Sequence, residues 1–455
     1  MVANRLFVPG AVQAETSSSR LAWLLFLVVN AALFMRPAEI VPELEGWPIY
    51  NVLILSCLVV AAPLVVRKLR GDALTRSPIT ICVLGMLPAV VFSLLAQGDT
   101  WNAREYGIEF FKVIVYYLLL VSLVRTPRRL SQFMLALALF ALVLNVVALL
   151  SYHKIIDLAT VAPLEETQFQ EHAYDEDREI VVRLQAAGIY GNPNDLARII
   201  AVGITVCIFA MARNRSFPVR LWWVLVLATL TYAMRLTYSR GGLLGLMAGM
   251  LVLIHARYGM KRGGWAILVL LPVLAFFGGR QTDIGTSSGT GQLRIRLWSE
   301  GLVALRASPV FGIGTDHYFR TAGNHAHNSF IEAFVETGLL GGISFTGAFF
   351  LATVGLYRLK SAELEREAPE LWSMRPYVLS LVVGTIVGQL SSSREYSLPT
   401  YMILGLAASY LALADERTPG TVERVSSRLT TRIILVGICT LVLLHFYTKL
   451  NARFN

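Results

Sequence analysis

Apolar residues lie along this chain in long uninterrupted runs that are separated by short polar links. Runs long enough to cross a bilayer, about 17–25 residues, recur from end to end, although several are weak or short. Their apolar positions are continuous rather than alternating, which is typical of membrane helices and not of barrel strands. The pattern predicts an all-α polytopic membrane protein with about 12 or 13 transmembrane helices, near 20–36, 49–66, 79–97, 107–124, 131–151, 195–213, 221–239, 241–257, 265–279, 330–357, 376–392, 398–415 and 431–448.

The composition agrees with a membrane protein and excludes a soluble one. Of the 455 residues, 55% are hydrophobic and only 15% are charged, and the mean hydropathy is +0.59. A soluble domain could not bury this much apolar surface. The cysteines all lie inside apolar runs without metal-binding or redox spacing, which indicates small buried side chains: Cys57, Cys82, Cys207 and Cys439.

Short basic connections predict how the chain lies in the membrane. Arginine and lysine favour cytoplasmic loops, and here they concentrate on every second connection. This alternation places the N-terminus in the cytoplasm together with the connections at 67–76, 125–129, 213–220, 257–262, 358–367 and 416–432. The net charge of +10 is then mostly anchoring charge beside membrane lipids. No basic stretch is predicted to carry the interleaved, exposed aromatic residues expected of a nucleic-acid site.

Two long connections are expected on the opposite, periplasmic face, and function is predicted to reside there. They divide the chain into N-terminal helices (1–151), a first loop (152–194), central helices (195–279), a second loop (280–329) and C-terminal helices (330–455). Long loops on one side of a rigid scaffold commonly carry functional residues. We expect short helices within these two loops.

The first loop ends in a turn that enters the next membrane helix. In "GIYGNPNDLARIIAV", Asn194 is predicted to cap the helix, with Asp195 in its first turn. Arg183, shortly before this turn, could bind an anion, because helix N-termini attract phosphate. A well-formed helix entry without further function explains the same residues equally well.

Four more arginines are predicted on the same face. Arg235 and Arg240 flank the turn in "MRLTYSRGG". Snorkelling would explain either arginine alone, but two so close together on the face where positive charge is sparse indicate function. In the second loop, Arg294 and Arg296 begin a short interfacial helix with Trp298 as its anchor.

The stretch "NHAHNSF" holds two histidines just before a membrane helix. Ser329 and Glu332 have the spacing of a capping box, so we expect the helix to begin at about Phe330 and "ETGLLGG" to bend it. His327 then stands beside a helix N-terminus, where partial positive charge disfavours imidazolium and keeps the ring able to accept a proton. His325 is a second imidazole two residues away, and capping or interfacial packing is the alternative role for either ring.

Four segments together resemble a known family. "RLQAAGIYGNPNDLA", "LTYSRGGLLGL", "RIRLWSEGLVALRASPVFGIG" and "HAHNSFIEAFVETGLLG" are similar to the ordered motifs of the O-antigen ligase and polymerase superfamily. The resemblance covers roughly 180–360; each motif alone is weak, and four in order are specific. Members are bacterial inner-membrane glycosyltransferases with a polytopic, all-helical fold.

The resemblance implies a reaction and a set of residues. Members move a glycan from undecaprenyl diphosphate to an acceptor hydroxyl at the periplasmic face, without a bound metal or other cofactor. By this resemblance His327 is the catalytic base, and Arg183, Arg240 and Arg294 bind the diphosphate. The supporting or acceptor-side candidates are His325, Asn194, Asn328, Arg235 and Arg296.

The superfamily includes two functions, which differ in the acceptor of the glycan. A ligase uses the lipid A core oligosaccharide and is favoured here, because the two outer loops look large enough to form a periplasmic cap. A polymerase uses another lipid-linked repeat and shares the same motifs. A flippase or transporter of lipid-linked sugars would need charges near the centres of several helices, where Lys112 is the clearest example. A membrane scaffold without catalytic activity is less favoured still.

Overall fold

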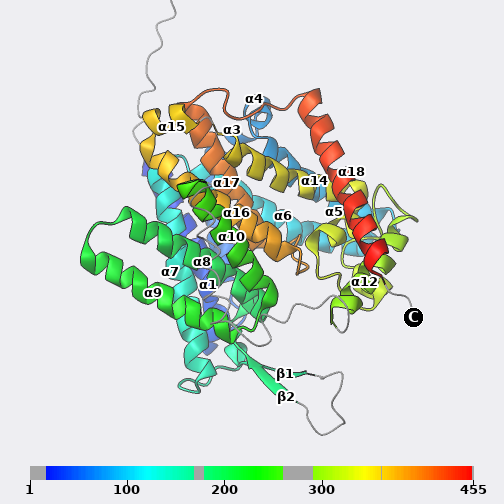
Figure 1. Cartoon of the computed structure of the whole chain (residues 1–455), viewed down its shortest axis with the longest axis horizontal. Coiled ribbons are helices and arrows are strands. Elements are labelled where there is room, and N and C mark those ends of the chain that lie inside the picture. Colours follow the sequence, from blue (N-terminus) through cyan, green and yellow to red (C-terminus); the bar gives the residue numbers. More distant parts are fainter. Residues whose placement is uncertain (1–16, 169–178, 260–289, 360, 453–455) are drawn as a thin grey trace, which may run out of the picture.

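The computed structural model describes residues 17–168, 179–259, 290–359 and 361–452. Within these ranges, 12 helices are long and apolar enough to cross a membrane. Twelve of the predicted runs coincide with them, which confirms the all-α polytopic fold, and the run at 265–279 lies outside the described residues. The helices are α1 (Ser17–Met35), α3 (Ile49–Lys68), α5 (Pro78–Leu95), α6 (Thr100–Leu123), α7 (Pro127–Tyr152), α8 (Pro193–Arg213), α9 (Phe217–Leu236), α10 (Arg240–Tyr258), α14 (Ser329–Tyr357), α16 (Pro369–Gln389), α17 (Leu398–Arg417) and α18 (Ser427–Asn451) (Figure 1).

Shorter elements fill the connections between these helices. They are α2 (Pro37–Ile40), α4 (Gly71–Thr75), α12 (Thr290–Leu305), α13 (Tyr318–Ala322), α15 (Ser361–Glu367) and three 3-10 turns, η1 (Pro42–Leu44), η2 (Ala159–Val161) and η3 (Gly188–Tyr190). The interfacial helix predicted in the second loop is α12, and α13 is a second short helix there.

The first loop differs from its prediction because it contains a β-hairpin. β1 (Leu164–Gln168) pairs antiparallel with β2 (Glu179–Arg183), with Leu164 opposite Arg183. The two strands are short, and no glycine, proline or asparagine between them marks a tight hairpin turn, so the hairpin was not predicted. The hairpin ends at Arg183 and so fixes where this arginine lies.

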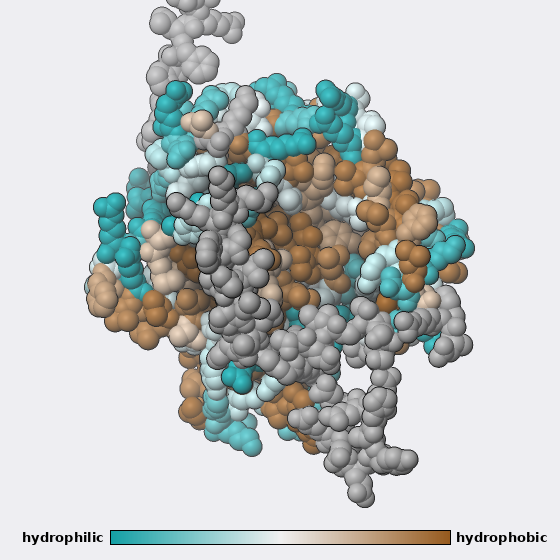
Figure 2. All heavy atoms as spheres, in the orientation of Figure 1, coloured by the Kyte–Doolittle hydropathy of each residue, from teal (hydrophilic) through white to brown (hydrophobic). Residues whose placement is uncertain are grey.

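Contacts between connections agree with the alternation of basic loops. Val425 N donates to Thr75 O at 2.8 Å, so the connections 67–76 and 416–432 meet. Arg213 pairs with Glu370 at 3.0 Å, so the connection 213–220 meets the start of α16. Gln292 donates to the carbonyl of Asn451. Figure 1 shows α4 and α15 at the upper end and the hairpin at the lower end. Figure 2 shows hydrophobic residues across the middle of this face and hydrophilic ones along its upper edge.

α14 is broken within "ETGLLGG", where a bend was predicted, and the end of the second loop packs against this break. Gly338 has φ 64° and ψ −161°, a backbone conformation that suits glycine. Ile313 N donates to Val335 O at 2.9 Å, and Gly314 N donates to Glu336 O at 3.0 Å. A Cβ on Gly338 would lie 2.2 Å from the carbonyl oxygen of Val310. The loop therefore docks directly on the broken helix and is anchored beside the two histidines.

Glycines allow α10 and α16 to pack closely. A Cβ on Gly245 would lie 2.8 Å from the carbonyl oxygen of Gly384, and one on Gly384 would lie 2.9 Å from that of Gly245. Small residues at such a crossing let helix backbones approach in a membrane. This contact fixes two walls of the cavity described next.

Candidate active site

A cavity of about 770 Å³ opens between α6, α8, α10, α16 and α17. Its helical walls are largely apolar, with residues such as Ile199, Leu246 and Ile403. Its polar end lies where the connection 390–397 meets the start of α14 and of α8. Residues with ionisable side chains gather at that end: Asp195, Arg198, Asp316, His325, Glu332, Glu336, Arg394 and Glu395. An apolar chamber with one polar end suits a ligand that has a lipid part and a polar head.

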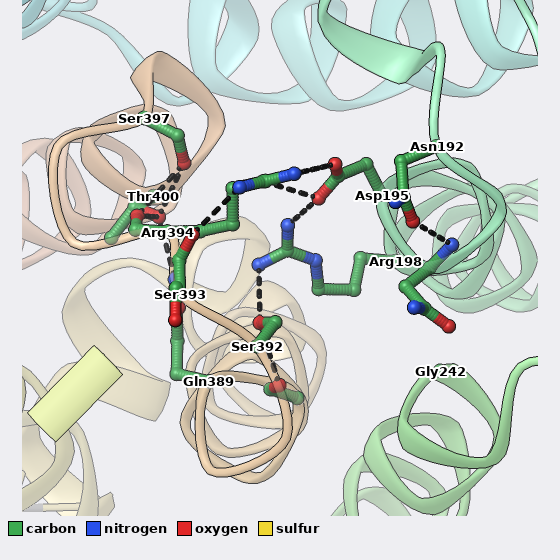
Figure 3. Close-up of polar contacts among 12 residues, drawn as sticks. Asn192, Asp195, Arg198, Gly242, Gln389, Ser392, Ser393, Arg394, Ser397 and Thr400 are labelled. Carbon is green, nitrogen blue, oxygen red and sulfur yellow. Dashed lines mark hydrogen bonds and ion pairs between the residues drawn. The ribbon is translucent and has the colours of Figure 1, made fainter. Parts of the chain in front are cut away.

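Asp195 joins two arginines at this polar end (Figure 3). Arg394 Nε lies 2.8 and 2.9 Å from the two oxygens of Asp195, and its Nη2 lies 2.6 Å from Oδ2. Arg198 binds the same carboxylate, and its Nη1 donates to Ser392 Oγ at 3.1 Å. Asp195 is only 6% exposed, so the two arginines compensate its carboxylate for lost contact with water. The cluster fastens α8 to the connection between α16 and α17.

The start of α14 differs from the predicted capping box. Asn328 is the N-cap, and its Oδ1 accepts from Phe330 N at 3.1 Å and Ile331 N at 3.3 Å. Ser329 instead donates to Ser392 O at 2.6 Å and accepts from Arg394 N at 2.8 Å. The prediction of a Ser329–Glu332 capping box is therefore wrong, because both side chains bind the neighbouring connection instead.

The cap of α8 is also displaced from its prediction. Asn192, not Asn194, is the N-cap, and its side chain accepts from Asn194 N at 2.8 Å. The Asn194 Oδ1 atom accepts from Ser239 Oγ at 2.8 Å and from Arg183 Nη2 at 3.2 Å. Asn194 thus links α8 to the turn before α10, which is where Arg240 begins its helix.

His325 forms a dyad with Glu332 at the cavity wall. Its Nδ1 lies 2.8 Å from Glu332 Oε1, while the other carboxylate oxygen accepts from Ala326 N at 3.2 Å and from the Ser393 hydroxyl. The hydrogen bond to Glu332 raises the pKa of His325 above its ordinary value, although burial opposes this. A histidine oriented by a carboxylate is a common arrangement for proton transfer.

His327 lies in a different environment from His325. Its backbone has φ 49°, and its N–H donates to Ser393 Oγ at 3.0 Å. Burial, and then the positive charge of Arg294, lower the pKa of His327 to about 4. The ring is therefore neutral near pH 7, as the sequence predicted, although burial and not the helix end is the largest cause. His327 is not among the residues that line the large cavity.

Two of the predicted arginines lie near one another and near His327. Burial, and then the charge of Arg240, lower the pKa of Arg294. Arg296, the alternative in "RIR", points away: its side chain is 73% exposed and pairs with Glu300 at 2.9 Å. Arg294 of α12 thus lies near enough to Arg240 of α10 and to His327, in the loop before α14, to interact with each of them electrostatically.

Arg183 has protein acceptors at each of its nitrogen atoms. It is 7% exposed, and its Nε donates to Thr237 O at 2.9 Å. Its Nη1 pairs with Glu166 at 2.8 Å, and its Nη2 donates to Asn194. These contacts hold the turn that presents Arg240. Arg235 is exposed at the end of α9, at the other side of the same turn.

Three carboxylates beside His325 were not singled out from the sequence as a cluster. Oxygens of Glu332, Glu336 and Glu395 lie within 4.8 Å of one another, a spacing that could hold a metal ion. Glu336 also accepts from Tyr396 Oη at 2.9 Å and from Tyr318 N at 3.2 Å. These bonds tie the second loop and the connection 390–397 to α14. Helical spacing places Glu332 and Glu336 on one face of α14, but only folding adds Glu395, so local spacing could not have revealed the whole cluster.

Comparison with known proteins gives a family match that includes some of the candidate site residues. Residues 225–346 match a family described as O-antigen ligase, which confirms the resemblance found in the motifs. The chain is also similar to the exopolysaccharide production protein ExoQ of Rhizobium meliloti (strain 1021), with 35% identity over 99 residues. That match covers 18% of this chain and 23% of the relative. Arg240, Arg294 and both histidines lie inside the family match, whereas Arg183, Asp195 and Arg394 lie outside it.

Proposed function

Because residues 225–346 carry the O-antigen ligase family region, we propose that this chain transfers a glycan from undecaprenyl diphosphate to an acceptor hydroxyl. We place the reaction at the periplasmic face of a bacterial inner membrane, where the alternation of basic loops predicts that this end of the molecule lies. The observation that carries the proposal is the grouping of Arg240, Arg294 and a neutral His327 within the matched region.

The two arginines suit a diphosphate leaving group. Neighbouring guanidinium groups repel each other, so an anion that binds both Arg240 and Arg294 relieves that repulsion. As the bond between the sugar and the diphosphate breaks, negative charge grows on the departing phosphate oxygen, and fixed cations stabilise it. We assign Arg183 to holding the turn before Arg240 rather than to the diphosphate, since its nitrogen atoms already bind Glu166, Thr237 and Asn194.

The acceptor hydroxyl needs a group that takes its proton. In the proposed step the hydroxyl oxygen attacks the anomeric carbon, undecaprenyl diphosphate leaves with the bonding electron pair, and a neutral imidazole takes the hydroxyl proton. His327 fits this role by its match to the family position, its neutral state and its place beside Arg294. The His325–Glu332 dyad is the second candidate, because it lines the cavity and has the more basic ring.

The acceptor is proposed in two forms. A lipid A core oligosaccharide would make the chain a ligase, which is the description of the matched family. A second lipid-linked repeat would make it a polymerase, and similarity to a protein named for exopolysaccharide production favours this second form. Both forms use the same transfer step and the same residues.

A pair of neighbouring arginines offers a matched test of the diphosphate site. Arg294→Gln should reduce transfer by about 10²–10³-fold, the typical cost of removing one donor to a developing negative charge. Arg296→Gln should retain activity within about twofold, since its side chain is exposed and pairs with Glu300. The measurement is glycan transfer in membranes, normalised to the amount of protein. Equal losses in both variants, or a loss only in Arg296→Gln, would remove Arg294 from the proposed mechanism.

A further inference from the structure

A second cavity of about 480 Å³ lies at the end of the molecule opposite the two histidines. It opens between α5, α14, α17 and α18, near the basic connections. Four cationic side chains line it, and we call it the basic cavity: Lys68, Arg76, Arg358 and Arg432. None of these four is used by the proposed transfer reaction.

Positive charge exceeds negative charge in the basic cavity. Of its lining residues only Glu423 is acidic, and it pairs with Arg432 at 2.9 Å. Glu416 lies near enough to Lys68 to interact with it electrostatically. Four cationic side chains are therefore balanced by only two carboxylates. The remaining positive charge is that of the two exposed arginines, Arg76 and Arg358. An anion is the ligand that this balance favours.

The wall of the basic cavity is apolar, which a soluble anion would not require. Ile79, Phe350, Leu351, Val354 and Leu435 contribute to it. Leu435 belongs to α18, of whose most apolar window only 11% is buried, so this helix faces lipid more than any other candidate span among the described residues. A cationic mouth over an apolar wall, beside a lipid-facing helix, matches a phospholipid with its phosphate at the mouth and an acyl chain along the wall.

We propose that the basic cavity binds an anionic phospholipid. Its phosphate lies between Arg76 and Arg358, close to Lys68, and one acyl chain follows Val354 and Leu435. The volume lies within the range of about 300–1,000 Å³ that is typical of specific ligand pockets. The bound lipid connects α18 to α5 and α14, so it stabilises the position of the last helix. This binding is independent of the proposed glycan transfer.

Lipid binding to the purified full-length protein tests this proposal. Native mass spectrometry in detergent would compare retention of phosphatidylglycerol with retention of phosphatidylcholine. We expect the anionic lipid to bind more tightly, and Arg76→Gln/Arg358→Gln to weaken it about 30-fold, from roughly 1 kcal/mol for each arginine. The matched control, Arg220→Gln/Arg366→Gln, removes two exposed arginines outside the cavity and should leave retention within about twofold. Arg76→Lys/Arg358→Lys keeps the charge and should keep most of the binding.

Three results would overturn the proposal. The first is equal retention of the two lipids, and the second is equal loss in the cavity variant and its control. The third is complete displacement of phosphatidylglycerol by millimolar inorganic phosphate, which would identify a soluble anion as the ligand. If the double variant does not accumulate, the single Arg358→Gln variant should still weaken binding about fivefold. Since the readout is lipid retention, its failure leaves the proposed transfer reaction untouched.

Discussion

His327→Ala is expected to lower the rate of glycan transfer by about 10²–10⁴-fold, the contribution of a general base. The variant should still accumulate in the membrane, because Asn328 caps α14 and Ser329 binds the neighbouring connection. His325→Ala, measured beside it at equal protein level, should keep a substantial fraction of the rate. If only His325→Ala is inactive, the His325–Glu332 dyad supplies the base. If both variants are active, neither ring does.

The pH dependence of transfer separates the two rings without a mutation. A base works only when it is unprotonated, and the pKa of His327 is lowered to about 4. With His327 as the base, the rate should stay nearly constant as the pH falls from about 8 to about 5.5. The pKa of His325 is raised above its ordinary value, so with His325 as the base the rate should already fall within that range. A fall that persists in His325→Ala would contradict both assignments.

Asp195→Asn is expected to destabilise the folded protein. The substitution leaves Arg198 and Arg394 close together without their shared carboxylate. Removing one partner of a buried pair costs about 3–5 kcal/mol, and we expect about 2–3 kcal/mol here because Arg394 is 39% exposed. Thermal unfolding of the purified variant in detergent measures the effect as a lower Tm.

Two control variants test whether the loss of stability in Asp195→Asn comes from the loss of this particular buried charge. Asp157→Asn removes an exposed carboxylate from the first loop and should leave the Tm unchanged. Asp195→Glu restores the charge and should recover part of the lost stability. An unchanged Tm in Asp195→Asn would mean that the arginine cluster contributes little to the attachment of α8.

The membrane helices could be predicted from sequence because the bilayer imposes a length and an apolar composition on each of them. The bend at Gly338 was predictable too, since its φ of 64° and ψ of −161° lie in a region that is essentially restricted to glycine. Local spacing also pointed to His325, His327 and the arginines of the second loop. Only the structure showed that Arg296 is exposed while Arg294 lies beside His327.

The helix caps could not be assigned correctly because tertiary contacts decide between adjacent candidates. Serine and asparagine are both good N-caps. Ser329 does not cap α14 because its hydroxyl forms hydrogen bonds with the connection 390–397. The side chain of Asn194 likewise accepts hydrogen bonds from Ser239 and Arg183, so Asn192 caps α8 instead. Such competition depends on residues far away along the chain.

The polar end of the large cavity was the part least accessible to sequence reasoning. Asp195 has Arg198 at helical spacing, but Arg394 is 199 residues away along the chain, so their pairing could not be foreseen from the sequence. Glu332 and Glu336 are neighbours on one face of α14, but Glu395 joins them only because α14 packs against the connection after α16. The hairpin that brings Glu166 to Arg183 was not predicted, so their ion pair could not be foreseen from the sequence.

The central claim is that this chain makes a glycosidic bond with a lipid diphosphate as the leaving group. The most direct measurement uses the purified protein in lipid vesicles, supplied with an undecaprenyl diphosphate-linked glycan and a glycan acceptor. The account predicts a larger acceptor product and the release of one undecaprenyl diphosphate for each bond formed, with both formed about 10²–10⁴-fold more slowly by His327→Ala. Movement of the intact lipid-linked glycan across the bilayer, with no bond formed and no undecaprenyl diphosphate released, would contradict it and identify a transporter.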